Sequence, residues 1–246
     1  MSVAAIEIIE VINRSKQGRT QPFLCRGEDD LLYYVKGRST GNRDLLCEWF
    51  SAHLARALGL PVPEFRIAFA QSSLIDLHPE GRALGTEPAF ASAVVGNCQE
   101  LTVSHIGSVP VLTRRDIFVF DLWIRNQDRT LSTLGGNPNL LWNAKDNAIS
   151  VIDHNLAFDR DFNRADFAQG HVFSQEMSNI TGDMIERRMY EERLTGALSA
   201  WEIARACAPQ EWWFVDPEQT LPTPFVADEL YRSLQMVNDQ EFWNLP

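Results

Sequence analysis

Residues with oxygen-bearing side chains gather in one stretch, Asn126 to Phe158, which reads NQDRTLSTLGGNPNLLWNAKDNAISVIDHNLAF. Asp128 lies in a polar segment, Asn137 and Asn139 lie in an Asn-rich turn, and Asp153 ends an apolar run. Carboxylate and amide oxygens, without thiolate or imidazole, are the ligands that suit a hard cation bound to phosphate oxygens. This set of residues therefore predicts metal-assisted chemistry at a phosphate group.

Two short apolar runs, Leu140–Trp142 and Ile149–Ile152, must position these side chains, and the polar turn Asn143–Asn147 between them predicts a β-hairpin. Such a hairpin holds Asp128, one Asn and Asp153 around a single point. The alternative is an ordinary hairpin in which Asn, Asp and Gly only form turns. The ordered set favours the functional interpretation, because Asp153 interrupts an apolar run where turn chemistry is not required.

The order Asp, Asn, strand, turn, strand, Asp matches that of phosphoryl-transfer enzymes of the protein-kinase type. The segments NQDRT, NPNLLW and VIDHNLAF resemble the catalytic and metal-binding motifs of HipA-like kinases. They are also similar to motifs of type II phosphatidylinositol 4-kinases. The resemblance covers about residues 16 to 160, and the C-terminal third matches more loosely.

The resemblance implies an α+β, two-lobe, protein-kinase-like fold. We expect a β-rich small nucleotide-binding lobe with one key helix over residues 1–97 and a mainly helical large catalytic lobe over residues 98–246. The implied reaction is transfer of the γ-phosphoryl group of ATP to a hydroxyl with the help of Mg²⁺. The family-level default for the acceptor is a protein serine or threonine.

The resemblance also assigns roles to residues of the central stretch. Asp128 would orient the acceptor and take its proton, and Arg129 would steady the loop or a phosphate. Asp153 would bind Mg²⁺ together with Asn137 or Asn139. In protein kinases the Asn follows the base by about five residues. Here the two Asn follow by nine and eleven, because residues 130–136 lengthen the loop, so both alignments stay open.

A buried carboxylate predicts an ion pair in the small lobe. The apolar pattern predicts a helix that begins at Asn42 or Asp44 and ends at Gly59, with Glu48 at the edge of its buried face. A carboxylate in that position needs a cationic partner. Lys36, at the end of an apolar strand, is the main candidate. Three arginines compete with it: Arg43, Arg56 and Arg66.

The polar segment Ser15–Pro22 (SKQGRTQP) falls where a kinase-like small lobe carries its phosphate-covering loop. HipA-like kinases have a similar Gly-x-Thr-x-Pro segment, and GLPVPEF after the helix also resembles them. The resemblance therefore implies nucleotide contacts for Gly18, Thr20, Lys36 and Glu48. With a single Gly, an ordinary hairpin turn is the alternative.

The remaining pattern predicts further elements. We expect a strand or a short helix over residues 3–12, and a link between the lobes at residues 96–99. Asp121, within a buried helix that runs into the Asp128 loop, is expected to pair with Arg125, and support of that loop is the alternative. The aromatic segment Gln210–Phe214 is expected to pack in the large lobe. Helices over 183–207 are expected to be capped at Thr181 and at Thr195 or Ser199. Other expected strands and helices are Phe23–Cys25, Phe65–Phe69, Ser73–Leu77, Ala89–Val95, Asp116–Arg125 and Pro224–Val237.

Composition restricts the partners and the compartment. The chain of 246 residues has a formal net charge of −11 and no basic cluster, which argues against nucleic acid or an anionic membrane surface as a partner. The four cysteines lie far apart, as in a reduced protein. The N-terminal apolar run is too short to span a bilayer and lacks signal-peptide features. A cytoplasmic protein is therefore expected.

Two rival functions remain. The first is a lipid or small-molecule kinase, or a nucleotidyl transferase that uses the same site. The second is a nucleotide-binding pseudokinase that regulates a partner protein, which the long loop after Asp128 favours. Retention of Lys36, Glu48, Asp128 and Asp153 favours an active kinase instead.

Overall fold

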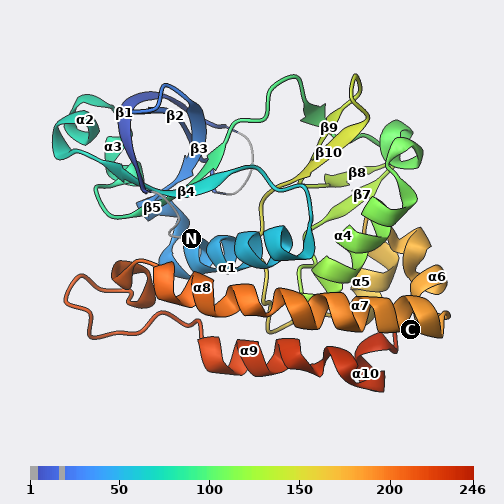
Figure 1. Cartoon of the computed structure of the whole chain (residues 1–246). Coiled ribbons are helices and arrows are strands. Elements are labelled where there is room, and N and C mark those ends of the chain that lie inside the picture. Colours follow the sequence, from blue (N-terminus) through green and yellow to red (C-terminus); the bar gives the residue numbers. More distant parts are fainter. Residues whose placement is uncertain (1–4, 17–19) are drawn as a thin grey trace. The chain divides into compact units, whose positions relative to one another are not determined.

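The computed structural model describes residues 5–16 and 20–246, and the chain divides into two compact units (Figure 1). Each unit combines stretches that are distant in the sequence. Unit 1 consists of Met1–Trp49, Pro63–Gly96 and Arg205–Phe225, and unit 2 of Phe50–Val62, Asn97–Ala204 and Val226–Pro246. The division into lobes at residue 97 stays a prediction.

A closed barrel with strand order β1-β2-β3-β5-β4 forms the centre of unit 1. The strands are β1 (Ala5–Arg14), β2 (Phe23–Gly27), β3 (Leu32–Lys36), β4 (Phe65–Ala70) and β5 (Ala89–Ala93). Alternate residues of these strands point inward, so that Phe23 and Cys25 of β2 and Tyr33 and Val35 of β3 are all buried. Parallel pairing of β1 with β4 closes the barrel. The N-terminal run is therefore a strand.

Helix α1 (Asn42–Leu58) has the predicted extent. Its residues from Leu45 to Ala55 are buried almost without interruption. Gly59 follows the last turn with φ 90°, a conformation that glycine adopts without a steric penalty, and its N–H donates to the Arg56 carbonyl oxygen (3.1 Å).

The strand predicted at Ser73–Leu77 is wrong, because this segment forms α2 (Ser72–Leu77), which α3 (Gly81–Leu84) follows. The N–H groups of Leu74 and Ile75 both donate to the Gln71 carbonyl oxygen, as at the start of a helix. A strand would place residues 75 and 77 on the same face. The helix instead buries Ile75 in the barrel core and leaves Leu77 84% exposed.

The aromatic segment near residue 212 belongs to unit 1, so its predicted place in the large lobe is wrong. Trp212 is buried, and its ring contacts that of Trp49 edge to face at 5.8 Å. Its indole N–H donates to the Pro88 carbonyl oxygen (2.8 Å). These contacts bring a stretch late in the sequence back to α1 and β5.

Helices predominate in unit 2, with α4 (Val111–Trp123) in its core. Residues 117–123 of α4 are all buried, as the apolar run predicts, although the helix begins earlier than expected. The other helices are α5 (Arg164–Gly170), α6 (Met177–Thr181), α7 (Met184–Ala197), α8 (Ser199–Cys207, with its last residues in unit 1), α9 (Ala227–Gln235) and α10 (Gln240–Trp243). Short 3-10 helices cover Arg38–Thr40, Val103–Ser108, Ser174–Glu176, Gln210–Trp213 and Met236–Asn238.

The cap predicted at Thr181 is wrong, because α7 begins after Asp183. The Asp183 side chain accepts hydrogen bonds from the backbone N–H groups of Ile185 (2.8 Å) and Glu186 (3.4 Å). Asp and Thr are both good capping residues. Here Gly182 ends the preceding helix and leaves Asp183 at the N-cap position of α7.

Two small sheets of unit 2 hold the central stretch of the sequence. One has strand order β10-β9-β6, with β6 (Gln99–Glu100), β9 (Leu140–Asn143) and β10 (Ala148–Val151). The other pairs β7 (Thr130–Ser132) with β8 (Gly135–Asn137). The hairpin predicted at residues 140–152 is confirmed.

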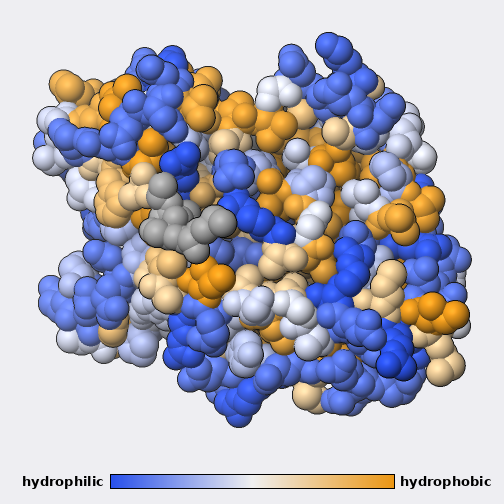
Figure 2. Space-filling model, in the orientation of Figure 1, coloured by the Kyte–Doolittle hydropathy of each residue, from blue (hydrophilic) through white to orange (hydrophobic). Residues whose placement is uncertain are grey.

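The α+β fold class is confirmed by a β-barrel in unit 1 and a mainly helical unit 2. Figure 2 shows a face on which hydrophilic residues predominate and hydrophobic residues form smaller patches. Among the described residues, no helix combines the length and the apolar character that crossing a membrane requires.

Candidate active site

Asp128 is the centre of a hydrogen-bonded cluster in unit 2. Both predicted asparagines reach it: Asn137 Nδ2 donates to Asp128 Oδ2 at 2.7 Å, and Asn139 Nδ2 donates to the same oxygen at 3.0 Å. Asn137 is exposed, whereas Asn139 is buried. The structure therefore brings together Asp128 and both asparagines that the sequence left as alternatives.

The additional loop residues after Asp128 form the β7–β8 hairpin. Thr130 pairs with Asn137 across the two strands, so the hairpin returns the chain to the point where it left the loop. Gly136 makes the close approach possible, because a Cβ there would lie 2.5 Å from the Thr130 carbonyl oxygen. The lengthened loop is therefore an ordered element that presents Asn137 to Asp128.

The backbone connects Asn139 with the segment that carries Asp153. The Ile152 N–H donates to the Asn139 carbonyl oxygen (3.1 Å), next to the β9–β10 pairing of Leu140 with Val151. Asn139 (φ 48°) and Asp153 (φ 56°) both have left-handed backbone conformations, which are uncommon outside glycine and cluster at functional sites.

The environment of Asp128 shifts the pKa of its carboxyl group upward. Burial raises the pKa of the Asp128 carboxyl group, and the nearby Asp153 carboxylate raises it further, against hydrogen bonds from the two asparagines and the charge of Arg129. A carboxylate with a raised pKa is a better proton acceptor, which suits the role of a general base.

Arg129 is wholly buried and holds the loop together. Its Nη1 donates to the carbonyl oxygens of Asn139 (2.6 Å), Pro138 (3.2 Å) and Ile152 (3.3 Å). One side chain thus fixes the turns before β9 and after β10. Of the two roles that the sequence left open, a loop-steadying role agrees with these contacts.

Asp121 pairs with Arg129, so the predicted Asp121–Arg125 pair is wrong. Arg129 Nε donates to Asp121 Oδ2 at 2.6 Å, and Asn126 Nδ2 donates to Asp121 Oδ1 at 2.9 Å. Burial alone would raise the pKa of Asp121, but the charge of Arg129 and a hydrogen bond from His171 hold it well below its usual range. A carboxylate inside an apolar helix needs such partners, and spacing alone pointed to the wrong arginine.

Sequence reasoning missed His171, which lies 2.9 Å through its Nε2 from Asp121 Oδ2. Asp121 and His171 are separated by 50 residues. No motif or periodicity joins positions that far apart. The signal available in the sequence was the charge of Asp121 within the apolar run DIFVFDLWIR, which required buried partners without identifying them.

In unit 1, Lys36 Nζ donates to Glu48 Oε1, so the predicted ion pair is confirmed. Both residues are buried, Lys36 at the end of β3 and Glu48 on α1. Thr20 is also buried, whereas Gly18 lies outside the described residues. The nucleotide roles of these four residues stay predictions.

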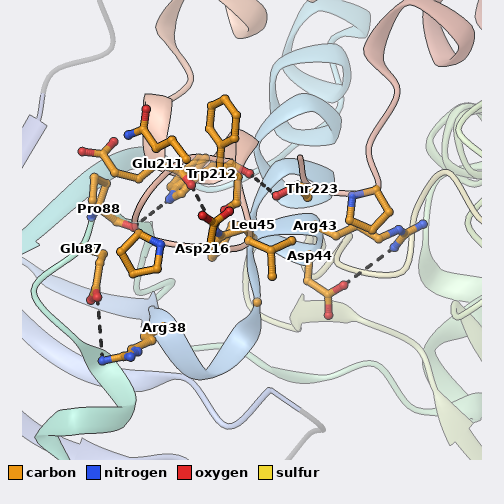
Figure 3. A pocket seen from close by; sticks show the side chains of 17 residues that line it. Arg38, Arg43, Asp44, Leu45, Glu87, Pro88, Glu211, Trp212, Asp216 and Thr223 are labelled. Carbon is orange, nitrogen blue, oxygen red and sulfur yellow. Dashed lines mark hydrogen bonds and ion pairs between the residues drawn. The ribbon is translucent and has the colours of Figure 1, made fainter. Parts of the chain in front are cut away.

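A cavity of about 550 Å³ in unit 1 lies against the first turn of α1 (Figure 3). Its wall includes the segment around Trp212, which Asn42 of α1 holds through hydrogen bonds from Nδ2 to the Glu211 and Phe214 carbonyl oxygens. The hydrogen bonds of Asn42 therefore anchor the start of the helix that carries Glu48. Lys36 and Glu48 are absent from the lining of the cavity among the described residues.

The donor set of the Asp128 cluster fits a hard divalent cation. Among the residues that the structure describes, no three His, Cys, Asp or Glu side chains surround one point. The residues whose chemistry would suit such a cation are Asp153, through its carboxylate, and Asn137 or Asn139, through an amide oxygen, with water and phosphate oxygens to complete the shell. Mg²⁺ binds in this way, through one or two carboxylates plus substrate phosphates.

Comparisons with known proteins identify the family of the chain. The family model for HipA-like kinases matches residues 8–246. The crystal structure of a Helicobacter pylori proinflammatory kinase, CtkA, is similar at 12% identity and a TM-score of 0.48, over 96% of this chain and 95% of that chain. The crystal structure of the Golgi casein kinase with Mn/ADP bound is similar at 13% identity and a TM-score of 0.43, over 99% of this chain and 73% of that chain. No curated protein matches the sequence significantly.

The family match supports a phosphotransferase of the kinase class. The chain belongs to the HipA-like kinase family, and the match extends to the last residue, beyond the stretch in which short motifs resemble the family.

Proposed function

We propose that this protein transfers the γ-phosphoryl group of ATP to a hydroxyl group in the presence of Mg²⁺, with a protein serine or threonine as the acceptor. The observation that carries the proposal is the hydrogen-bonded cluster of Asp128 with Asn137 and Asn139. The two amide N–H groups would fix the orientation of Asp128 as a base, and the amide oxygen of one asparagine would be a ligand for the cation.

In this reaction Asp128 orients the acceptor hydroxyl and accepts its proton. Its raised pKa and its two hydrogen bonds from asparagines favour that role. Arg129 does not contact the phosphates but holds the loop through three backbone carbonyl oxygens.

Asp153 and Asn139 are the proposed ligands of Mg²⁺, which when bound neutralises phosphate charge. Asn139 is favoured over Asn137 because it is buried and its backbone bonds to Ile152, the neighbour of Asp153. Asn137 then serves to orient Asp128 from the β7–β8 hairpin.

In unit 1, Lys36 binds the nucleotide phosphates and Glu48 orients the Lys36 ammonium group. The buried ion pair supports this assignment, because it holds the Lys36 ammonium group in place at the end of β3. Thr20 and Gly18 contact the phosphates from the segment between β1 and β2.

The test distinguishes the proposed role of Asp128 as a base from that of Asp153 as a metal ligand. Calorimetric titration with ATP and Mg²⁺, beside a radiolabel transfer assay, is applied to the wild type, Asp128→Asn and Asp153→Asn. Asp128→Asn should retain near-normal affinity while transfer falls about 10²–10⁴-fold. Asp153→Asn should lose affinity together with transfer, because charge neutralisation is needed in the bound state as well.

The matched control is Asp146→Asn, which changes an exposed carboxylate in the turn between β9 and β10. It should leave binding and transfer unchanged. If the wild type binds ATP with Mg²⁺ and transfers nothing, a nucleotide-binding pseudokinase replaces the proposal. If the Asp128 and Asp153 variants behave alike in binding, the assignment of their roles is wrong.

A further inference from the structure

A buried polar cluster lies beneath the Asp128 loop in unit 2. Asp121 and Arg129 are wholly buried, and His171 is 4% exposed. The Asp121 carboxylate accepts on both oxygens: Oδ1 bonds to Asn126 (2.9 Å) and Arg129 (3.4 Å), and Oδ2 bonds to Arg129 (2.6 Å) and His171 (2.9 Å). Each oxygen therefore has two partners, and together they set the orientation of the carboxylate.

The hydrogen bonds of His171 define its tautomer. The backbone N–H of Phe173 donates to His171 Nδ1 (3.1 Å), so Nδ1 is an acceptor and the ring proton resides on Nε2. The Nε2–H group then donates to Asp121. With a neutral imidazole, the cluster contains one guanidinium and one carboxylate and has no net charge. Burial lowers the pKa of His171, which agrees with the neutral form.

The backbone joins the same residues. The Val172 N–H donates to the Arg129 carbonyl oxygen (3.0 Å), and His171 forms an isolated antiparallel bridge with Thr130. The segment after α5 therefore pairs directly with the two residues that follow Asp128. The His171 side chain reaches the Arg129 guanidinium group through Asp121, whereas the backbone of this segment bonds to the main chain at Arg129 and Thr130.

We propose that His171 is a positioning residue for phosphoryl transfer. Its hydrogen bond orients the Asp121 carboxylate, which holds Arg129, and Arg129 in turn sets the loop that carries Asp128. Without His171, Asp121 Oδ2 keeps only Arg129 as a partner, so the carboxylate loses one of the four hydrogen bonds that set its orientation and the loop loses a restraint. This inference rests on the proposed function for its effect on rate, but not for its effect on loop order.

Packing is the competing explanation for the place of His171. Its ring centroid lies 5.0 Å from that of Phe167, 5.2 Å from Phe118 and 6.0 Å from Phe173. A residue that only fills space between these rings would be replaced best by Phe. A residue that acts through its hydrogen bond would be replaced best by a side chain that keeps a donor near Asp121.

Three variants distinguish these explanations. His171→Gln keeps an N–H donor near the position of Nε2, His171→Asn keeps a polar group that is too short to reach Asp121, and His171→Phe keeps the aromatic packing. Each is assayed with ATP and Mg²⁺ for release of labelled phosphate to water and for labelling of the chain itself. Amide hydrogen exchange over residues 126–139 is measured in the same samples, and His53→Gln serves as a control for replacing a buried histidine.

We expect His171→Asn and His171→Phe to lower kcat at least about tenfold, with the KM for ATP changed by less than about twofold. His171→Gln should recover most of the rate. Exchange over residues 126–139 should be faster in the Asn and Phe variants but near the wild-type rate in the Gln variant and in His53→Gln.

Recovery of rate and exchange by Phe rather than Gln would overturn the inference, as would equal behaviour of all three variants. If the wild-type protein turns over no ATP, the proposed function fails, and the order of the variants in hydrogen exchange alone decides whether His171 positions the loop.

Discussion

Among single residues, the buried Lys36–Glu48 pair allows the sharpest separation of function from stability. Removing one partner of a buried ion pair typically costs about 3–5 kcal/mol, because the other charge stays buried. Glu48→Gln alone would therefore lower stability and activity together. Replacing both charges by apolar residues of similar volume is often neutral or stabilising.

The double variant Lys36→Met/Glu48→Leu should therefore unfold in urea near the wild-type midpoint yet lose ATP affinity by calorimetry. Arg26→Met/Glu10→Leu is the matched control, since it removes a surface pair of unit 1 (3.0 Å) with half-exposed side chains. It should change neither quantity appreciably. Undiminished ATP affinity in the Lys36/Glu48 variant would show that the pair is structural and does not bind the nucleotide phosphates.

Among the elements, the β7–β8 hairpin holds Asn137 against Asp128, the proposed base. Gly135 (φ 110°) and Gly136 (φ 153°) both have backbone conformations that are strained for alanine. Only Gly136 also lacks space, because its added Cβ would meet the Thr130 carbonyl oxygen at 2.5 Å, whereas that of Gly135 would point into open space.

Gly136→Ala should therefore displace Asn137 from Asp128 and lower the transfer rate well below that of Gly135→Ala, with ATP affinity retained in both. The two variants share the conformational cost, so their difference isolates the position of Asn137. Radiolabel transfer and calorimetry on the pair measure this difference. Equal transfer rates in the two variants would show that Asn137 does not orient Asp128.

For the whole molecule, buried histidines predict a loss of stability in mild acid. Burial, with a smaller contribution from Arg56, lowers the pKa of His53 from 6.5 to about 4. As pH falls below 6.5 the unfolded chain takes up this proton and the folded chain does not, so the free energy of unfolding decreases until pH falls below about 4. The shift corresponds to a loss on the order of 3 kcal/mol. Burial lowers the pKa of His171 as well, so His171 also makes the free energy of unfolding decrease as pH falls.

Urea unfolding of the wild type and of His53→Gln between pH 7 and pH 4 measures this contribution. The variant should lose less stability across that range, by the amount that His53 contributes. Only the difference between the two proteins is attributed to His53, because other groups titrate in both. Parallel pH profiles would show that His53 titrates alike in the folded and unfolded chains.

The sequence by itself determined the local parts of the candidate site. Asp128, Asn137, Asn139 and Asp153 lie within one hairpin-containing stretch, and short-range turn and strand patterns predict that they lie close together. The Lys36–Glu48 pair was also predictable, because a carboxylate on a buried helix face needs a cation and a strand ends on one nearby. Periodicity and the cost of an unpaired charge are enough to predict that Glu48 has a cationic partner, with three arginines as competitors of Lys36. The roles of the Asp and Asn residues came from the resemblance to HipA-like kinases.

Only the tertiary structure decided which distant residues meet. His171 reaches Asp121 across 50 residues, and the segment at Trp212 returns to Trp49 in unit 1. Whether Ser72–Leu77 became a strand or a helix also depended on how Ile75 packs in the barrel core. Periodicity describes one segment at a time, whereas the partner of a buried charge or ring is selected by the packing of the whole unit.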